Sequence, residues 1–522
     1  MIFKKITTLS DSDLQKLITF FGILIACQIT YIQHGWVNDD SILYFEMARL
    51  FSTGAWKQGI ELFNWPFYPL LISAIHQTTH LAIQTSAQVL NILFFAITTF
   101  SFISLIRLAG GNKATIIFGA FLLLSSSYIV GDVLAMLLRD QGFWAMFLTS
   151  LVYFIQFYRN NKISDALLWQ ISAIVAVLFR IEAISYLIGL PLTLLLRFEY
   201  SFKQNITDLF KINIIPICTL SLIFGVLIFI PSIHLSDFGR LQEAVTIFPR
   251  MLTEITHMFK LKASIMGEMV LGEYIHNYGM MGIMLTLIAI VIFKVLTLIS
   301  WPVMGVLALS HAYQHHQPIE PTIQQDTRKI FYWVITISLL NAWVIITSVF
   351  VLSGRYLIAL GFLILIFAAF QMASLIKFFR TTSDDKRWGK ALLILLLALI
   401  CFFGIKNLLP KPSDYIFEQN AVAYIKKQHI QNNEVFYVTP RSRYYADAPY
   451  AGRGYDYWQY TKKAIENGSI YQFNYLMINV NIDEKLPEKQ KILSEKLPQY
   501  KIIKEFFGYR NKKKIMLYMK ND

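Results

Sequence analysis

Charged residues are scarce in this sequence, because lysine, arginine, aspartate and glutamate together make up only 15% of its 522 residues. Cysteine is scarcer still: the three copies all lie inside apolar runs, so no disulfide framework is available. The chain instead has 55% apolar side chains and a mean hydropathy of +0.49. This composition excludes a set of ordinary soluble domains and predicts a polytopic, all-α membrane protein.

Long apolar runs predict how the chain crosses the membrane. A spanning helix needs about 20 mostly apolar residues, and about eleven runs qualify. They cover roughly 15–32, 83–107, 114–131, 142–158, 163–182, 183–197, 212–231, 278–310, 330–352, 356–376 and 391–408. The sixth run is short, and the eighth is long enough to kink at Trp301-Pro302. If either run is re-entrant, the number of spans changes by one.

Lysine and arginine in the short connections predict the orientation, because such residues are retained on the cytoplasmic side. If the N-terminus is cytoplasmic, the basic residues of these connections, such as Arg107, Arg159, Arg197 and Arg328, all fall inside. The C-terminus then lies outside, in the periplasm if the membrane is a bacterial inner membrane. The net charge of +14 is therefore explained by topology and a basic tail, and not by nucleic-acid binding.

Three long segments are predicted to share the non-cytoplasmic side: about 33–82, about 232–277, and the tail from about 409. The first two have the spacing of amphipathic, surface-lying helices, the second broken at Pro249. Residues 1–408 are thus predicted to be the transmembrane domain and 409–522 a soluble extracytoplasmic α/β domain. In this tail, "FEQNAVAYIKKQ" predicts a helix, "EVFYVT" and "FNYLMINV" predict strands, and "KIIKEFFGYRNKKKIMLYMK" predicts a hairpin turning near Asn511.

Charged side chains at the predicted outer ends of the spans need a reason, because a charge at the bilayer centre costs about 2.5–3.5 kcal/mol. They are Asp39, Asp40, Asp132, Arg139, Asp140, Arg180, Glu182 and Arg355. Guanidinium groups bind phosphate and a carboxylate can act as a base. All these residues are expected to face one compartment, so the set fits a site for an anionic, phosphorylated substrate.

Each of these residues also has a structural explanation. Asn38 followed by two acids is a good helix start, with an Asn cap and acids in the first turn. Arg139 and Asp140 fit a simple interfacial pair, and Arg355 fits an arginine that extends to the lipid headgroups. Arg180 and Glu182 are different, because almost no loop separates the two apolar runs that flank them, which favours a polar cavity.

The pattern of these motifs resembles the membrane-embedded GT-C glycosyltransferases that use polyprenyl-phosphate sugars, among them lipid A aminoarabinose transferases and protein O-mannosyltransferases. The stretches that carry the resemblance are "NDDSILYFEMARLFSTGAW", "NWPFYPLLISAI", "LLRDQGFWAMFL", "LFRIEAI" and "SGRYLIAL". They extend over nearly the whole chain and match the bacterial branch most closely. The usual acidic pair of the family is Asp followed by Glu, whereas this chain has Asp39 followed by Asp40, so either acid can hold the catalytic position.

The resemblance implies an inverting displacement on the periplasmic side of the inner membrane. Asp39 or Asp40 would take the proton of an acceptor hydroxyl on lipid A, lipopolysaccharide, another glycan or a protein. The substrate-binding set implied by the resemblance and by the outer charges comprises Tyr44, Arg139, Asp140, Arg180, Glu182, Arg355 and Tyr356. Some relatives use a divalent cation, for which Asp39, Asp40 and Asp140 are the candidate ligands.

Two other classes of protein remain open at this point. A lipid-linked glycan flippase would also have arginines in a central cavity, but it has little need for paired acids in an outer loop or for a soluble outer domain. An O-antigen-type polymerase or ligase uses outer-loop arginines on similar substrates. The acidic pair directly after the first span argues against that class.

Overall fold

The computed structural model describes residues 9–230, 256–314, 321–381, 386–410, 416–452 and 456–521. The chain separates into two compact units. The first, here called the helical unit, comprises residues 1–29, 89–135 and 139–408; the second, the mixed unit, comprises 30–88, 136–138 and 409–522. The last part of the mixed unit begins at residue 409, where the tail was predicted to begin. The first predicted outer segment, about 33–82, belongs to the same unit as the tail.

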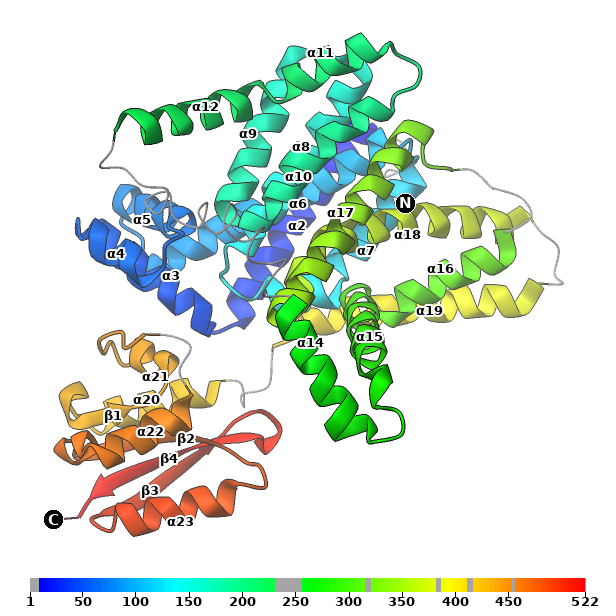
Figure 1. Ribbon diagram of the computed structural model, residues 1–522. Helices are drawn as coiled ribbons and strands as arrows, with labels where there is room; N and C mark the ends of the chain where they lie inside the picture. The colour runs from blue at the N-terminus through cyan, green and yellow to red at the C-terminus, as the bar shows by residue number, and fades with distance from the viewer. Residues whose placement is uncertain are drawn as a thin grey trace. The chain divides into compact units, whose positions relative to one another are not determined.

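The helical unit is built mostly from apolar helices (Figure 1). In chain order these are α2 (Asp11–Ile32), α6 (Ile83–Leu108), α7 (Lys113–Leu124), η1 (Ser127–Val133), α8 (Asp140–Asn160), α9 (Ile163–Phe179), η2 (Ile181–Ala183), α10 (Ile184–Gly189), η3 (Leu190–Leu196), α11 (Phe202–Ile212), α12 (Ile214–Phe229), α14 (Thr256–Ile265), η6 (Met266–Leu271), η7 (His276–Tyr278), α15 (Gly279–Ile299), α16 (Trp301–Gln314), α17 (Gln325–Val349), η8 (Gly354–Leu357), α18 (Ile358–Thr381) and α19 (Arg387–Asn407). The part of the predicted segment 232–277 that precedes 256, with its break at Pro249, lies outside the described residues.

Seven of the described helical segments are long and apolar enough to cross a membrane, or eight if the bent pair α11 and α12 is counted as one span. Three other predicted spans are not among these segments: α9 has only 17 residues, 183–197 forms short helical turns, and α8 is a continuous helix of 21 residues with charged residues at its ends. The long run at 278–310 breaks into α15 and α16 at Ser300, whose φ is 73°, next to the predicted kink. The multi-pass architecture is therefore confirmed, while the number of full-length spans is smaller than the apolar runs indicate.

Burial differs sharply among these helices. The apolar window of α18 is 83% buried, whereas those of α15 and α19 are only 22% buried. An apolar helix with most of its surface exposed in the chain itself is the kind of helix that a lipid environment covers. α18 is thus a central helix of its unit, and α15 and α19 present the surfaces that fit lipid contact.

The mixed unit combines three helices near the N-terminus with a small α/β fold. The helices are α3 (Asp39–Ser52), α4 (Trp56–Leu62) and α5 (Phe67–Thr79). The tail contributes α20 (Phe417–Lys427), η11 (Asn432–Glu434), β1 (Val435–Tyr437), α21 (Pro440–Tyr445), α22 (Tyr457–Glu466), η12 (Ser469–Gln472), β2 (Tyr475–Asn481), α23 (Leu486–Lys496), β3 (Tyr500–Phe507), η13 (Tyr509–Asn511) and β4 (Lys513–Lys520). The predicted helix, both strands and the hairpin that turns at Asn511 are confirmed.

The four strands form one sheet in the order β1-β2-β4-β3, with β1 and β2 parallel and the other pairs antiparallel (Figure 1). Alternate residues of a strand point to opposite faces. Accordingly, Leu476 and Ile478 pack with residues of α22 and α23, whereas Met477 packs with α20 and α21. The sheet is therefore covered by helices on both faces, which explains why its central strands are almost continuously apolar.

Candidate functional site

The acidic pair begins a helix, as the sequence predicts. The Asn38 side chain accepts a hydrogen bond from the backbone N–H of Asp40 at 3.0 Å, and α3 begins at Asp39. This cap satisfies an amide that no helical carbonyl can reach, and the acids of the first turn interact favourably with the helix dipole. The structural explanation for the pair is confirmed, and it leaves both carboxylates at a defined position for chemistry.

Two residues of the tail hold the Asp39 carboxylate. Arg441 Nε lies 3.2 Å from Asp39 Oδ1, and the phenol of Tyr457 donates a hydrogen bond to Asp39 Oδ2 at 3.1 Å. Burial and the nearby Asp39 carboxylate raise the pKa of the Tyr457 phenol above its ordinary value. Asp39 is therefore already engaged by a cation and by a hydrogen-bond donor.

Arg441 also pairs with a second carboxylate, that of Glu418. Arg441 Nη2 lies 2.8 Å from Glu418 Oε1, and Glu418 is only 2% exposed. The other oxygen of Glu418 accepts hydrogen bonds from the hydroxyls of Thr439 at 2.6 Å and Ser442 at 3.2 Å. Burial disfavours the charge on Arg441, but Glu418 and Asp39 outweigh this effect and raise the pKa of Arg441. We call Asp39, Glu418, Arg441 and Tyr457 the α3–tail network.

Tyr44 packs inside the mixed unit. It is buried, and its ring makes an edge contact with Tyr68 at a centroid distance of 5.3 Å and lies 6.5 Å from the ring of Phe63. Such aromatic contacts stabilise the packing of α3 against α5. The structure therefore gives Tyr44 a packing role, and its predicted contact with a donor substrate stays a prediction.

In the helical unit, four predicted site residues converge on Arg180. Its guanidinium forms an ion pair with Asp140 through Nη1, and its Nε lies 3.3 Å from Glu182 Oε2. Arg355 Nη1 lies 3.7 Å from the second oxygen of Asp140, and the Arg180 guanidinium lies 4.6 Å from the centre of the Tyr356 ring. We call these five residues the Arg180 cluster. The structure thus brings these five predicted site residues together, and their binding of a substrate stays a prediction.

Local backbone structure explains how the Arg180 cluster forms. Asp140 is the first residue of α8, and Arg180 ends α9, where its extended backbone separates α9 from η2. α8 and α9 pack closely, because Gly142 has no side chain and a Cβ there would come within 2.3 Å of the Phe179 ring. Gly354 likewise allows the ring of Tyr128 to approach η8, the turn that carries Arg355 and Tyr356.

The two arginines of the cluster have different surroundings. Arg180 is 6% exposed in its side chain and faces two carboxylates, so its charge is already neutralised inside the protein. The side chain of Arg355 is 32% exposed, and its contact with Asp140 is long for an ion pair. Arg180 therefore organises the cluster, and Arg355 is better placed to meet a substrate anion. Arg139, the residue before Asp140, is partly exposed.

A further buried ion pair was not foreseen. Arg197, predicted to be a cytoplasmic loop residue, is 4% exposed and pairs with Asp208 at 2.5 Å. Asn161 and Asn205 complete its surroundings: Asn161 donates to Asp208 at 2.7 Å, and Asn205 donates to the Arg197 carbonyl at 3.0 Å. This pair joins α11 to the turn η3 and has no open face, so we assign it a structural role.

Metal ligands do not gather in the described parts of the chain. Across these residues, no group of three or more histidine, cysteine, aspartate or glutamate side chains could hold an ion. The Asp140 carboxylate faces two guanidinium groups, which compete with a cation for its oxygens. The cation site suggested for Asp39, Asp40 and Asp140 stays a prediction.

Sequence reasoning missed Glu418, Arg441 and Tyr457. The tail segment that carries two of them, "TPRSRYYADAPY" and the following "YDYW", is unusually rich in arginine and tyrosine for a small soluble domain. That density was the available signal, since arginine and tyrosine are enriched where polar contacts are buried. Asp39, which contacts Arg441 and Tyr457, lies about 400 residues away from them in the sequence. No local sequence pattern reports a contact at that separation.

Comparison with known proteins gives a limited result. No protein-family model and no curated protein matches the chain. Among solved structures, the chain is similar to ArnT from Cupriavidus metallidurans bound to undecaprenyl phosphate, with 12% sequence identity, a TM-score of 0.41 and coverage of 97% of both chains. At this identity and score the likeness assigns neither activity nor substrate.

Proposed function

We propose that this chain is a membrane glycosyltransferase that moves a sugar from a polyprenyl-phosphate donor to a hydroxyl of an envelope acceptor, such as lipid A, lipopolysaccharide, another glycan or a protein. The observation that carries the proposal is the Arg180 cluster, which places two arginines, two acids and a tyrosine together at the ends of apolar helices. Charges in such a place are costly and are typical of substrate sites. The sequence motifs that contain these residues are those that resemble GT-C glycosyltransferases.

The contacts of Asp39 argue against this acid of the pair as the base. The Asp39 carboxylate accepts a hydrogen bond from Tyr457 and faces Arg441, so fewer of its lone pairs remain for an acceptor hydroxyl. Asp40 follows Asp39 in the first turn of α3, and its backbone N–H donates a hydrogen bond to the Asn38 side chain that caps the helix. We therefore assign proton transfer to Asp40 and positioning of the turn to Asp39.

The proposed reaction is one displacement. The acceptor oxygen attacks the anomeric carbon of the sugar, its proton passes to the Asp40 carboxylate, and the bond between that carbon and the phosphate oxygen breaks with its electron pair on the phosphate. The configuration at the anomeric carbon inverts. Arg355 neutralises the charge that develops on the departing polyprenyl phosphate, while Asp140 and Glu182 hold Arg180 as the fixed centre of the cluster.

The proposed location is a bacterial inner membrane, with the N-terminus in the cytoplasm and residues 409–522 in the periplasm. The distribution of basic residues supports this orientation. The donor would reach the enzyme within the bilayer, since a polyprenyl chain is a lipid. Residues 1–408 would form the catalytic membrane domain, and the tail would support the acid-bearing helix α3 through Arg441.

The proposal is tested by transfer of radiolabelled sugar from a panel of polyprenyl-phosphate sugars to native envelope acceptors, in membranes with equal amounts of each variant. Asp40→Asn should lower the rate by about 10²–10⁴-fold, the usual contribution of a general base. Asp39→Asn should reduce it less. Asp483→Asn is the matched control, because Asp483 is a partly exposed acid of the mixed unit whose partners, Lys489 and the backbone amide of Lys485, lie close to it in the sequence.

Two results would contradict the proposal in different ways. If both Asp39→Asn and Asp40→Asn retain the full rate, the assignment of the base is wrong although the reaction class stands. If the wild-type protein transfers none of the sugars to a verified acceptor, the reaction class is wrong, and transport of a lipid-linked glycan becomes the leading hypothesis.

A further inference from the structure

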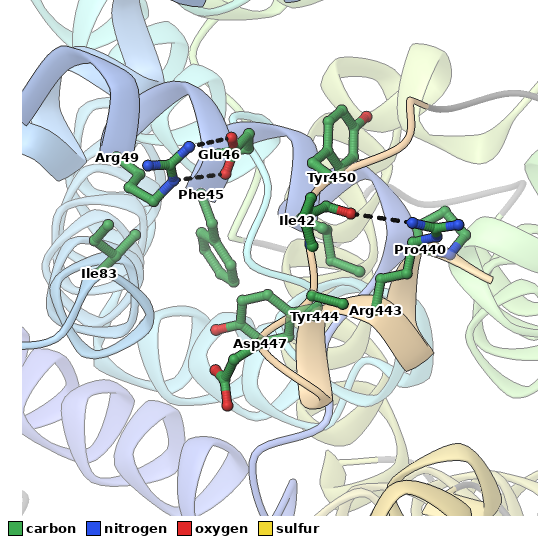
Figure 2. A pocket seen from close by; sticks show the side chains of 12 residues that line it. Ile42, Phe45, Glu46, Arg49, Ile83, Pro440, Arg443, Tyr444, Asp447 and Tyr450 are labelled. Atoms are coloured by element: carbon green, nitrogen blue, oxygen red, sulfur yellow. Dashed lines mark hydrogen bonds and ion pairs between the residues drawn. The ribbon is translucent and has the colours of Figure 1, made fainter. Parts of the chain in front are cut away.

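The mixed unit contains a cavity of about 570 Å³ that the proposed reaction does not explain (Figure 2). Its walls come from α3, from the start of α6 and from the segment at 440–450. The lining residues are Ile42, Phe45, Glu46, Arg49, Ile83, Pro440, Arg443, Tyr444, Asp447, Ala448, Pro449 and Tyr450. A volume in this range is typical of sites for small molecules.

Aromatic rings form part of the wall. Phe45 and Tyr444 lie with their centroids 5.6 Å apart, and Figure 2 shows both rings among the lining side chains together with Tyr450. The Tyr444 hydroxyl donates a hydrogen bond to Gln84 at 2.9 Å, which fixes the orientation of its ring. Flat apolar faces of this kind pack against the carbon-hydrogen face of a sugar ring, as they pack against other apolar surfaces.

The charged groups of the wall are already matched. The Glu46 carboxylate accepts hydrogen bonds from Nε and Nη2 of Arg49, at 2.9 and 2.6 Å (Figure 2). Arg443 donates to the Tyr437 carbonyl at 3.1 Å, to the Pro449 carbonyl at 3.3 Å and to the Tyr460 hydroxyl at 3.2 Å. The lining thus holds two arginines and two carboxylates and has no net charge, in contrast to a phosphate site, where positive charge is in excess.

Carboxylate oxygens remain available as hydrogen-bond acceptors. Asp447 is mostly exposed, and one of its oxygens pairs with Lys426 at 2.8 Å. A carboxylate has about four lone-pair sites, so Asp447 and Glu46 can each accept further hydrogen bonds. Aromatic faces, carboxylate acceptors and a lining without net charge match the chemistry of a neutral sugar, which has an apolar face and a rim of hydroxyl donors.

The cavity shares a helix with the proposed base. Asp40 lies in the first turn of α3, and Glu46 of the cavity follows six residues later, about 9 Å along the helix at 1.5 Å per residue. A ligand bound beside Phe45 and Glu46 would therefore lie on the same helix as the acidic pair, somewhat less than two helical turns from it.

We propose that this cavity binds a neutral sugar ring of the acceptor, and that the acceptor is therefore a glycan or glycolipid. The identification of this sugar as part of the acceptor rests on the proposed function. The binding of a neutral sugar can be tested without any transfer reaction.

The test is saturation-transfer NMR on the full chain in lipid nanodiscs, with the methyl glycosides of glucose, galactose and N-acetylglucosamine as probes. At least one of them should bind the wild type. Tyr450→Ala should weaken that binding at least tenfold by removing an aromatic wall, whereas Tyr450→Phe should retain most of it. Phe507→Ala is the matched control, because Phe507 is a partly exposed aromatic residue of the same unit outside the cavity.

Tyr450→Ala could lose binding simply because the variant misfolds, so Glu46→Gln provides a second test. This change keeps the size of the side chain, weakens it as an acceptor and removes its partly exposed ion pair with Arg49. It should lower affinity several-fold with an unchanged unfolding temperature. Absence of binding by all three glycosides, or equal binding by wild type, Tyr450→Ala and Glu46→Gln, would overturn the inference. Stronger binding of inorganic phosphate than of any glycoside, lost in Tyr450→Ala, would also overturn it.

Parallel transfer assays distinguish this inference from the proposed function. Sugar binding at the cavity without any transfer activity would uphold the binding site and contradict the glycosyltransferase. If no glycoside binds and both Tyr450→Ala and Glu46→Gln transfer sugar at the wild-type rate, the glycosyltransferase is upheld and the sugar-binding cavity is contradicted.

Discussion

The Arg180 cluster and the α3–tail network both place one arginine between two carboxylates, but they are assembled from different parts of the sequence. In the Arg180 cluster, Asp140 and Glu182 lie within about 40 residues of the arginine, at the ends of helices that follow one another. In the α3–tail network, Glu418 is a neighbour of Arg441 in the tail, while Asp39 comes from the first helix of the mixed unit.

The two buried arginines therefore have different functions: one holds neighbouring helices together, and the other joins segments that are far apart in the sequence. Arg180 holds successive helices together at a place where a second arginine, Arg355, remains partly exposed. Arg441 instead joins the tail to the turn that carries the acidic pair, so the tail affects the position of the proposed base. Removal of one carboxylate from either arginine leaves a buried charge less well compensated, which costs more than the intact pair contributes.

The largest effect is expected for Asp140→Asn. It removes the carboxylate that pairs with Arg180 in an almost fully buried setting, and we expect a loss of about 3–5 kcal/mol in the free energy of unfolding. Thermal unfolding of the purified protein in detergent measures it. The double variant Asp140→Asn with Arg180→Gln should recover part of this loss; a double variant that is less stable still would show that the pair is not the cause.

Arg355→Ala should separate catalysis from stability. Because the side chain is partly exposed and its ion pair is long, we expect a change in unfolding free energy below about 1 kcal/mol. The rate of sugar transfer should fall by about 10²–10³-fold, as for the loss of one group that stabilises developing charge. Arg355→Lys, which keeps the charge but not the fork, should recover a fraction of the rate. Unchanged transfer by Arg355→Ala would remove this residue from the proposed site.

Arg441→Gln should weaken the α3–tail network by leaving Glu418 buried without its cation, at a cost of about 2–3 kcal/mol. Combination with Glu418→Gln should restore most of the stability. The transfer rate should fall as well, since Asp39 loses its partner. Arg510→Gln, at an exposed turn of the same unit, is the control, and equal effects of both changes would contradict a specific role for Arg441.

The smallest effect is expected at alkaline pH. Burial raises the pKa of Tyr445, whose hydroxyl accepts a hydrogen bond from the Val37 amide at 3.1 Å. Above the ordinary tyrosine pKa of about 10, the unfolded chain releases this proton before the folded one does, so stability falls as the pH rises. Tyr445→Phe should lose less stability between pH 9 and pH 11 than the wild type does. The same loss in both would show that other tyrosines, such as Tyr444, whose pKa burial raises to about 12, dominate this range.

Several parts of the molecule followed from the sequence alone. Apolar runs of helical length identified the membrane class, because the hydrophobic effect acts on composition before any tertiary contact exists. The Asn38 cap, the strands of the tail and the turn at Asn511 depend on neighbouring residues only, so local propensity was sufficient for them. The sequence also indicated that Asp140, Arg180 and Glu182 need an explanation, because charges near the ends of membrane helices are costly.

Other features were decided by the tertiary structure. Apolar composition could not show that α9 is too short for a full span or that α18 is central while α15 is exposed, because burial depends on which helices pack together. The neutralisation of Arg180, the greater exposure of Arg355 and the pairing of Asp39 with Arg441 all depend on distances between segments. The sequence by itself thus determined which charged residues need an explanation, and only the folded chain decided which of them are paired with each other and which can meet a substrate.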